Sequence, residues 1–189
     1  MQLYALCDAM LLASKGLSLE EFVDVARKHD AKVLQYRDKS GDEVAIKNAL
    51  IKLRKLYDGF LIVNDHIDLV RFCDGVHLGQ EDLLRLGADK KASIKALRSK
   101  VGRDKIIGLS THNEAEILEA NEMSLNYIGL GALRATTTKS DATNILGSRL
   151  DELASISTHP VAVIGGVRFD DSFEHVSYRV MGSGLFRED

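Results

Sequence analysis

The chain has 189 residues, of which 45% are hydrophobic and 28% charged, and its formal net charge is -3 at pH 7. This balance excludes the basic surface typical of nucleic-acid binding, and no apolar run approaches the ~20 residues of a membrane-spanning helix. The two cysteines, Cys7 and Cys73, have no metal-ligand spacing, so we expect free thiols in a cytoplasmic protein. The length suits one domain spanning residues 1–189.

Short apolar segments alternate with longer segments of helical periodicity along the chain. The expected strands are Leu3–Cys7, Lys32–Arg37, Phe60–Val63, Gly75–Leu78, Ile106–Leu109, Tyr127–Leu130, Val161–Ile164 and Tyr178–Met181. The expected helices include Leu19–His29, Glu43–Tyr57, Lys90–Lys100 and Asn113–Glu122. Such alternation leaves a closed barrel or a doubly wound open sheet, and we favour a compact α/β protein with a (βα)8 TIM barrel.

The C-terminal part of this barrel has little room for helices. Phe169–Ser177 allows only a short seventh helix, and the chain ends at Asp189 soon after the eighth strand, so the eighth helix is expected to be missing or minimal. One flank would then be thinly covered, and a homodimer in which a second subunit shields it is our expectation.

Polar, charged and glycine residues follow the carboxyl ends of the expected strands, where (βα)8 barrels carry their active sites. The candidates are Gln35, Arg37, Lys39, Asn64, Asp65, Asp82, Ser110, Thr136, Thr138, Lys139, Gly166, Gly182 and Ser183. Gly165–Gly166 and Gly182–Gly184 fall in the two loops that commonly bind phosphate, where glycine permits close approach and positive φ. Tight turns without a ligand are the alternative for each pair.

The charged candidates suggest a diphosphate site. Arg37, Lys39 and Lys139 can converge on such a group, although ordinary surface charge is the alternative. Asp65 and Asp82 follow adjacent strands and can hold Mg2+, which takes one or two carboxylates plus substrate phosphates. Alternatively, Asp82 caps the next helix and Asp65 pairs with a neighbouring histidine or lysine.

The histidines are weaker candidates. His77 lies inside a strand and is expected to be a packed, structural residue, whereas His112 stands on the rim, where the start of a helix explains it equally well. We expect no Cys–His or Ser–His–Asp arrangement for nucleophilic catalysis.

Taken together, these segments resemble the thiamine phosphate synthase family. The matching segments, in chain order, are Gln35–Lys39, Val63–Asp65, Asp74–Asp82, Gly108–His112, Tyr127–Gly131, Thr136–Lys139 and Ala162–Val167. The sequence departs from the family where Ala132 and Ala135 replace the usual prolines, and where Tyr178-Arg179 replaces Asp-Gly.

The resemblance implies an enzyme that joins 4-amino-5-hydroxymethyl-2-methylpyrimidine diphosphate to 4-methyl-5-hydroxyethylthiazole phosphate and releases pyrophosphate. It implies that Asp65 and Asp82 bind Mg2+ and that Gln35 holds the pyrimidine. It further implies that the diphosphate is bound by Arg37, Lys39, Asn64, Ser110 and Lys139, of which Arg37, Ser110 and Lys139 would be catalytic. The thiazole phosphate would be bound by Thr136, Thr138, Gly166, Gly182 and Ser183. The partners implied are these small molecules, with neither nucleic acid nor membrane.

Three other functions stay open at this point. A thiazole tautomerase-like isomerase would need an acid–base residue such as His112 and no diphosphate site. A non-catalytic protein that binds thiazole phosphate or thiamine phosphate would fit the shortened C-terminal part. A phosphosugar isomerase is the third, because fold alone does not fix function.

Overall fold

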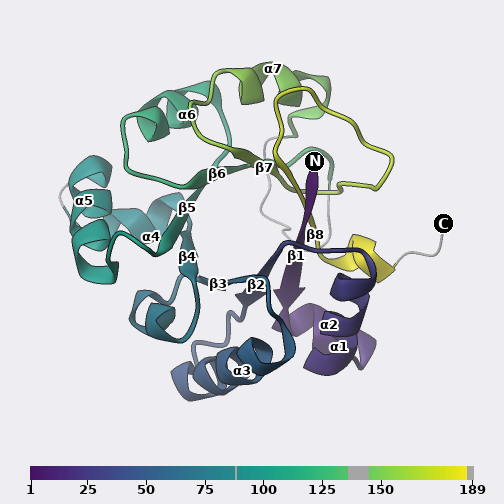
Figure 1. Cartoon of the computed structure of the whole chain (residues 1–189). Coiled ribbons are helices and arrows are strands. Elements are labelled where there is room, and N and C mark those ends of the chain that lie inside the picture. The colour runs from purple at the N-terminus through teal and green to yellow at the C-terminus, as the bar shows by residue number, and fades with distance from the viewer. Residues whose placement is uncertain (88, 136–144, 187–189) are drawn as a thin grey trace.

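The structure is a computed structural model that describes residues 1–87, 89–135 and 145–186. Eight parallel strands in these ranges close into a barrel in chain order, with helices outside it (Figure 1). The strands are β1 (Gln2–Asp8), β2 (Val33–Arg37), β3 (Phe60–Asn64), β4 (Gly75–Leu78), β5 (Ile106–Thr111), β6 (Tyr127–Leu130), β7 (Val161–Val163) and β8 (Tyr178–Met181). Pairing of β1 with β8 completes the ring, which confirms the predicted barrel.

The α-helices are α1 (Ala9–Lys15), α2 (Leu19–Lys28), α3 (Glu43–Leu56), α4 (Gln80–Leu84), α5 (Lys90–Val101), α6 (Glu114–Asn121) and α7 (Leu150–Ser155). Three 3-10 helices, η1 (Ile67–Phe72), η2 (Gly147–Arg149) and η3 (Ser183–Phe186), complete the helical set of the described ranges. The four helices predicted from sequence agree with α2, α3, α5 and α6 to within one residue at each end. None of the helices that the structure describes has the length and apolar character needed to cross a membrane.

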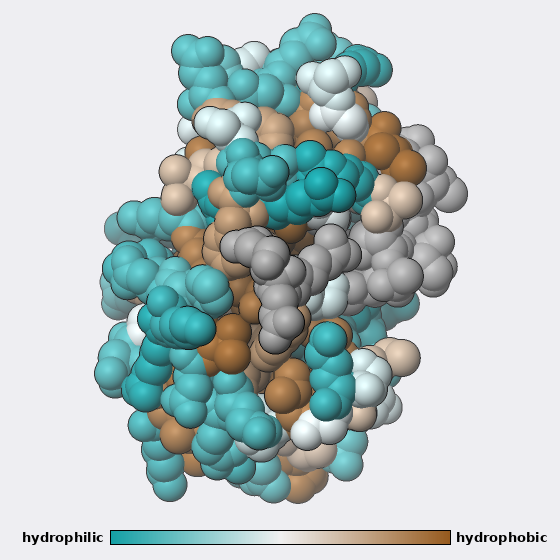
Figure 2. All heavy atoms as spheres, turned by 90° about the vertical axis from the view of Figure 1, so that its right-hand side faces the viewer, coloured by the Kyte–Doolittle hydropathy of each residue, from teal (hydrophilic) through white to brown (hydrophobic). Residues whose placement is uncertain are grey.

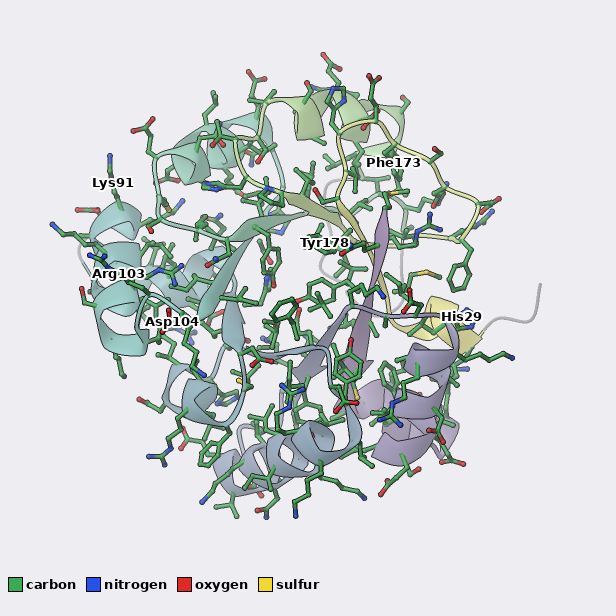
Figure 3. The ribbon with its side chains drawn as sticks, viewed as in Figure 1. His29, Lys91, Arg103, Asp104, Phe173 and Tyr178 are labelled. Atoms are coloured by element: carbon green, nitrogen blue, oxygen red, sulfur yellow. The ribbon has the colours of Figure 1, made fainter. Side chains whose placement is uncertain are left out.

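Side chains of each strand alternate between two cores, as the period of a β-strand requires. In β1, Leu3, Ala5 and Cys7 pack outward beneath the helices, whereas Tyr4 and Leu6 face the barrel interior. The inner cluster comprises Tyr4, Leu6, Val33, Ile62, Tyr127, Ala162 and Val180. Tyr178 packs against this cluster and lies inside the ring of strands in Figure 3, whereas Lys91 lies on the outer side of α5.

The flank between β7 and β8 carries no helix, so the predicted short seventh helix is wrong. Residues 164–177 form a loop whose backbone N–H groups bond to carboxylates, which competes with helix formation. Asp151 accepts from the N–H groups of Glu174 and His175, both at 3.0 Å, and Asp171 accepts from that of Arg168 at 2.8 Å.

Beyond β8, the described residues form only η3, in agreement with a minimal eighth helix. On the side of the molecule that carries the β7–β8 connection and η3, apolar residues are visible between hydrophilic ones (Figure 2). The homodimer that would cover the face stays a prediction.

Candidate functional site

A cavity of about 100 Å3 that is open to solvent lies at the carboxyl-end side of the barrel interior. The lining residues come from all eight strands and the loops that follow them: Tyr4, Leu6, Gln35, Arg37, Lys39, Asn64, Asp65, His77, Gly79, Asp82, Ser110, Tyr127, Gly129, Ala162, Ile164 and Val180. Seven predicted site residues (Gln35, Arg37, Lys39, Asn64, Asp65, Asp82 and Ser110) are among them.

The alternation of the strands explains why polar side chains converge here. Gln35 and Arg37 occupy inward positions of β2 and lie beside Leu6 and Asp8 of β1 in the parallel register. Neighbouring strands contribute their own inward polar positions near their carboxyl ends, so a set far apart in sequence shares one cavity.

A continuous chain of hydrogen bonds crosses the cavity floor. Gln35 donates through Nε2 to Asn64 Oδ1 at 2.7 Å, and Tyr4 donates to Gln35 Oε1 at 2.7 Å. The hydroxyls of Tyr4 and Tyr127 lie 2.8 Å apart. The chain continues from Tyr127 to His77 Nδ1 at 2.9 Å and from His77 Nε2 to Ser110 Oγ at 2.9 Å. The site is therefore a pre-organised polar surface that links β1 through β6.

The direction of these bonds follows from donor counting. Tyr4 uses its one hydrogen on Gln35, so Tyr127 donates to Tyr4 and His77 Nδ1–H donates to Tyr127. His77 Nε2 pairs with the Ser110 hydroxyl, which can also rotate toward a substrate oxygen. Burial raises the pKa of both Tyr4 and Tyr127, which keeps the phenols protonated.

Two glycines make this arrangement possible. A Cβ on Gly108 would lie 2.5 Å from the Tyr127 hydroxyl oxygen and closer still to its ring. A Cβ on Gly129 would lie 3.1 Å from His77 Cε1. Residues without side chains in β5 and β6 thus leave the space that the two rings fill.

The predicted metal ligands lie together at the cavity rim. Burial raises the pKa of the Asp82 carboxyl, and the charge of Asp65 and a hydrogen bond with it raise that pKa further. Lys39 binds Asp65 at 2.7 Å and partly offsets the repulsion, while Asp82 also contacts Arg85 at 3.3 Å. Asp65 has a left-handed φ of 64°, a conformation that is uncommon outside glycine and is found at functional sites.

This pair fits a Mg2+ ion. Two hard carboxylates that repel each other gain from a cation between them, and Mg2+ characteristically leaves its other positions to water and substrate phosphates. Among the described residues, no group of three or more His, Cys, Asp or Glu side chains could hold a metal ion on its own.

The cationic candidates already have carboxylate partners. Arg37 pairs with Asp8, which is 3% exposed and also accepts from Leu11 N at 3.1 Å to cap α1. Lys39 pairs with Asp65. The predicted convergence with Lys139 lies outside the described residues, as do Thr136 and Thr138.

The two glycine-containing loops differ from each other. Gly165 and Gly166 have positive φ values of 93° and 65°, whereas Gly182 and Gly184 do not have positive φ. Gly182 instead permits a close approach, because its Cβ would lie 3.2 Å from the Leu6 carbonyl oxygen. Gly166, Gly182 and Ser183 do not line the cavity; they lie just beyond Ile164 and Val180, which do.

Sequence reasoning missed Tyr4, Tyr127, Asp8 and the role of His77. The contact of His77 Nε2 with Ser110 Oγ at 2.9 Å was not anticipated. The other ring nitrogen of His77 lies 2.9 Å from the phenol oxygen of Tyr127.

His112 binds Glu116 at 3.0 Å in the first turn of α6 and does not line the cavity, in keeping with the helix-start alternative. The alternation of β4 could have placed His77 inside the barrel, since Val76 and Leu78 face outward.

Comparisons with known proteins agree with this geometry. A family model described as thiamine monophosphate synthase matches residues 3–184. The chain is 35% identical over 172 residues to the thiamine-phosphate synthase of Persephonella marina, and this alignment covers 88% of this chain and 77% of that relative. It is 36% identical over 172 residues to the thiamine-phosphate synthase of Lawsonia intracellularis, which covers 88% and 74%.

Solved structures give the same result. The thiamine phosphate pyrophosphorylase from Pyrococcus furiosus superposes with a TM-score of 0.79 at 27% identity and covers 100% of this chain and 89% of that one. The thiamine phosphate pyrophosphorylase from Bacteroides thetaiotaomicron, at 13% identity and a TM-score of 0.59, shares the fold. The chain belongs to the thiamine monophosphate synthase family.

Proposed function

We propose that the protein is a Mg2+-dependent transferase that joins the pyrimidine diphosphate to the thiazole phosphate, forming thiamine phosphate and pyrophosphate. The observation that carries the proposal is the pairing of Asp65 and Asp82 beside Lys39, at the rim of a cavity with a neutral hydrogen-bonded floor. A charged rim above a neutral floor suits a substrate with a diphosphate at one end and a nitrogen heterocycle at the other.

The floor can recognise the heterocycle. The Gln35 amide has four hydrogen-bonding positions, of which Tyr4 and Asn64 occupy two and fix its orientation. One donor and one acceptor position therefore stay available to an aminopyrimidine edge. The His77 and Tyr127 rings stack with centroids 5.5 Å apart and provide a flat boundary.

The rim can bind the diphosphate. Asp65 and Asp82 would hold Mg2+, which supplies positive charge against the leaving diphosphate. Lys39 and Arg37 add cationic donors, and Ser110 can turn its hydroxyl toward a phosphate oxygen. Lys139 is proposed to add a further charge, following the family pattern.

The chain stabilises bond cleavage without becoming covalently attached. The bond between the methylene carbon and the diphosphate oxygen breaks, and its electron pair leaves with the diphosphate. The aminopyrimidine ring delocalises the resulting positive charge, and the thiazole nitrogen then bonds to the methylene carbon. Donors already aimed at the departing charge lower the barrier, and holding the two substrates together supplies much of the remainder.

Gly166, Gly182 and Ser183, together with Thr136 and Thr138, are proposed to hold the thiazole phosphate. A Cβ on Gly166 would lie 2.8 Å from Arg134 Cβ and one on Gly182 would lie 3.2 Å from the Leu6 carbonyl oxygen, so both positions allow a close approach of backbone. We further propose that the protein acts in the cytoplasm.

The test is a coupled assay for pyrophosphate release with both substrates and Mg2+, alongside detection of thiamine phosphate. Asp65→Asn should lower turnover by at least about 100-fold, since it removes a charged ligand worth several kcal/mol of leaving-group stabilisation. Asp68→Asn is the matched control, because Asp68 is 74% exposed and binds Lys100 away from the cavity.

Calorimetry with pyrophosphate separates the alternatives. A synthase binds pyrophosphate in the presence of Mg2+ and loses that binding in EDTA, whereas a tautomerase or a non-catalytic binding protein shows no metal-dependent pyrophosphate binding. Absence of such binding, together with absence of turnover, would reject the proposed function.

A further inference from the structure

The loop between β7 and β8 is held by side chains from other parts of the protein rather than by helical hydrogen bonds (Figure 1). Asp151 of α7 accepts from two of its N–H groups, and Arg179 of β8 donates to its backbone carbonyls. Phe169 stacks on His29, which follows α2 and is labelled in Figure 3, with ring centroids 4.8 Å apart. The position of this loop therefore depends on a small number of side chains.

Arg134 makes the strongest of these contacts. It follows β6 and forms a two-pronged ion pair with Asp171, with Nη1 at 2.7 Å from Oδ2 and Nη2 at 2.6 Å from Oδ1. The Asp171 side chain is 11% exposed and also accepts from Arg168 N at 2.8 Å. A forked pair of this kind fixes both partners more firmly than an ion pair with a single contact does.

The same arginine holds two consecutive carbonyls of the glycine segment. Arg134 N donates to Gly165 O at 2.9 Å, and Arg134 Nη1 donates to Gly166 O at 2.8 Å. A trans peptide group is planar, and its C=O and N–H point in opposite directions. The N–H groups of Gly166 and Val167 therefore point away from Arg134, and within the described ranges neither has an acceptor.

The packing transmits the position of Arg134 directly to the loop. A Cβ on Gly166 would lie 2.8 Å from Arg134 Cβ, and one on Gly165 would lie 2.6 Å from Ala132 Cβ. The two backbones are thus in contact without an intervening side chain.

We propose that Arg134, locked by Asp171, is a positioning residue that aims the N–H groups of Gly166 and Val167 at the phosphate of the thiazole substrate. This inference rests on the proposed function, and it assigns a role to two residues outside the cavity lining. Arg134 acts through the loop, by fixing its carbonyls, and does not itself contact the reacting atoms.

The first test compares KM values for the two substrates. Arg134→Met keeps the aliphatic stem and removes the charge and both side-chain bonds, so it should raise KM for thiazole phosphate at least about tenfold and leave KM for the pyrimidine diphosphate within about twofold. Arg134→Lys should recover part of the loss. Asp171→Asn keeps the shape and should give a smaller change, and the double variant should be no worse than Arg134→Met.

Arg103→Met is the matched control, because Arg103 follows α5 and is exposed at the outside of the barrel (Figure 3). Equal increases in both KM values, or a loss of kcat alone, would overturn the proposal by indicating general loosening of the barrel. Asp171→Asn and Arg134→Lys keep the test informative if Arg134→Met folds poorly.

The second test does not require turnover. Inorganic phosphate should shift the backbone amide NMR resonances of Gly166 and Val167 in the wild-type protein, and the shift should be lost in Arg134→Met. If these resonances move without turnover, the loop assignment holds and the proposed synthase activity fails. If they do not move in a wild-type protein that turns over, the positioning role is rejected.

Discussion

Gly108→Ala tests how the cavity floor is built. The new Cβ would lie 2.5 Å from the Tyr127 hydroxyl oxygen and overlap the ring of this buried side chain. Displacing Tyr127 would also break its hydrogen bonds to Tyr4 and His77. Overpacking costs about 1–3 kcal/mol, and leaving two buried groups without their hydrogen-bond partner adds about 1–3 kcal/mol. We therefore expect the free energy of unfolding to fall by about 2–6 kcal/mol.

Urea unfolding followed by circular dichroism measures this loss, and the assay for pyrophosphate release should show reduced turnover of the folded fraction. Gly129→Ala is the graded comparison, because its Cβ would approach His77 Cε1 only to 3.1 Å and should cost about 1 kcal/mol or less. In a Tyr127→Val background, Gly108→Ala should be almost neutral, since the ring is gone. An equal cost in both backgrounds would refute the steric explanation.

Two further substitutions probe the floor and the rim. Tyr4→Phe leaves the buried Gln35 Oε1 without its donor, so KM for the pyrimidine diphosphate should rise about 5- to 30-fold for a loss of about 1–2 kcal/mol, whereas Tyr178→Phe, the control, should change it little. Asp82→Asn should abolish Mg2+-dependent turnover yet raise the urea midpoint of the metal-free protein at neutral pH, as measured by unfolding at several pH values. The pKa of Asp82 is raised in the folded state, so its stability contribution is complete below the unfolded pKa and is lost as pH rises through the folded pKa. A wild-type midpoint that does not fall relative to Asp82→Asn across that window would contradict this reasoning.

Local sequence signals were sufficient for most of the architecture. Each of the eight strands is a short apolar run bounded by polar residues, and Ser18 and Asn113 cap α2 and α6 with side-chain bonds to Glu21 N at 3.2 Å and Glu116 N at 2.9 Å. The short helices α1, α4 and α7 were not predicted. They have five to seven residues each, too few for helical periodicity to stand out.

Residues at strand ends were predictable because a parallel barrel brings all carboxyl ends to one side. Contacts across the barrel were not, because they depend on closure of the whole ring. Tyr4 and Tyr127 are 123 positions apart and meet only when β1 and β6 face each other across the interior. The Arg134–Asp171 pair, 37 positions apart, depends on the path of a loop that was expected to be helical.

The two halves of the proposed site are therefore stabilised in different ways. Barrel strands carry Gln35, Asn64 and Ser110, so moving these side chains requires disruption of the sheet or the buried network. The glycine loop is fixed by charged contacts from Arg134 and its neighbours, which can break while the barrel stays closed. Changes to the loop should consequently alter recognition of the second substrate before they alter folding, whereas changes to the floor should affect both together. The same division explains why the connection between β7 and β8, which contains no helix, can still hold a fixed position: the forked Arg134–Asp171 ion pair replaces a helix as its support.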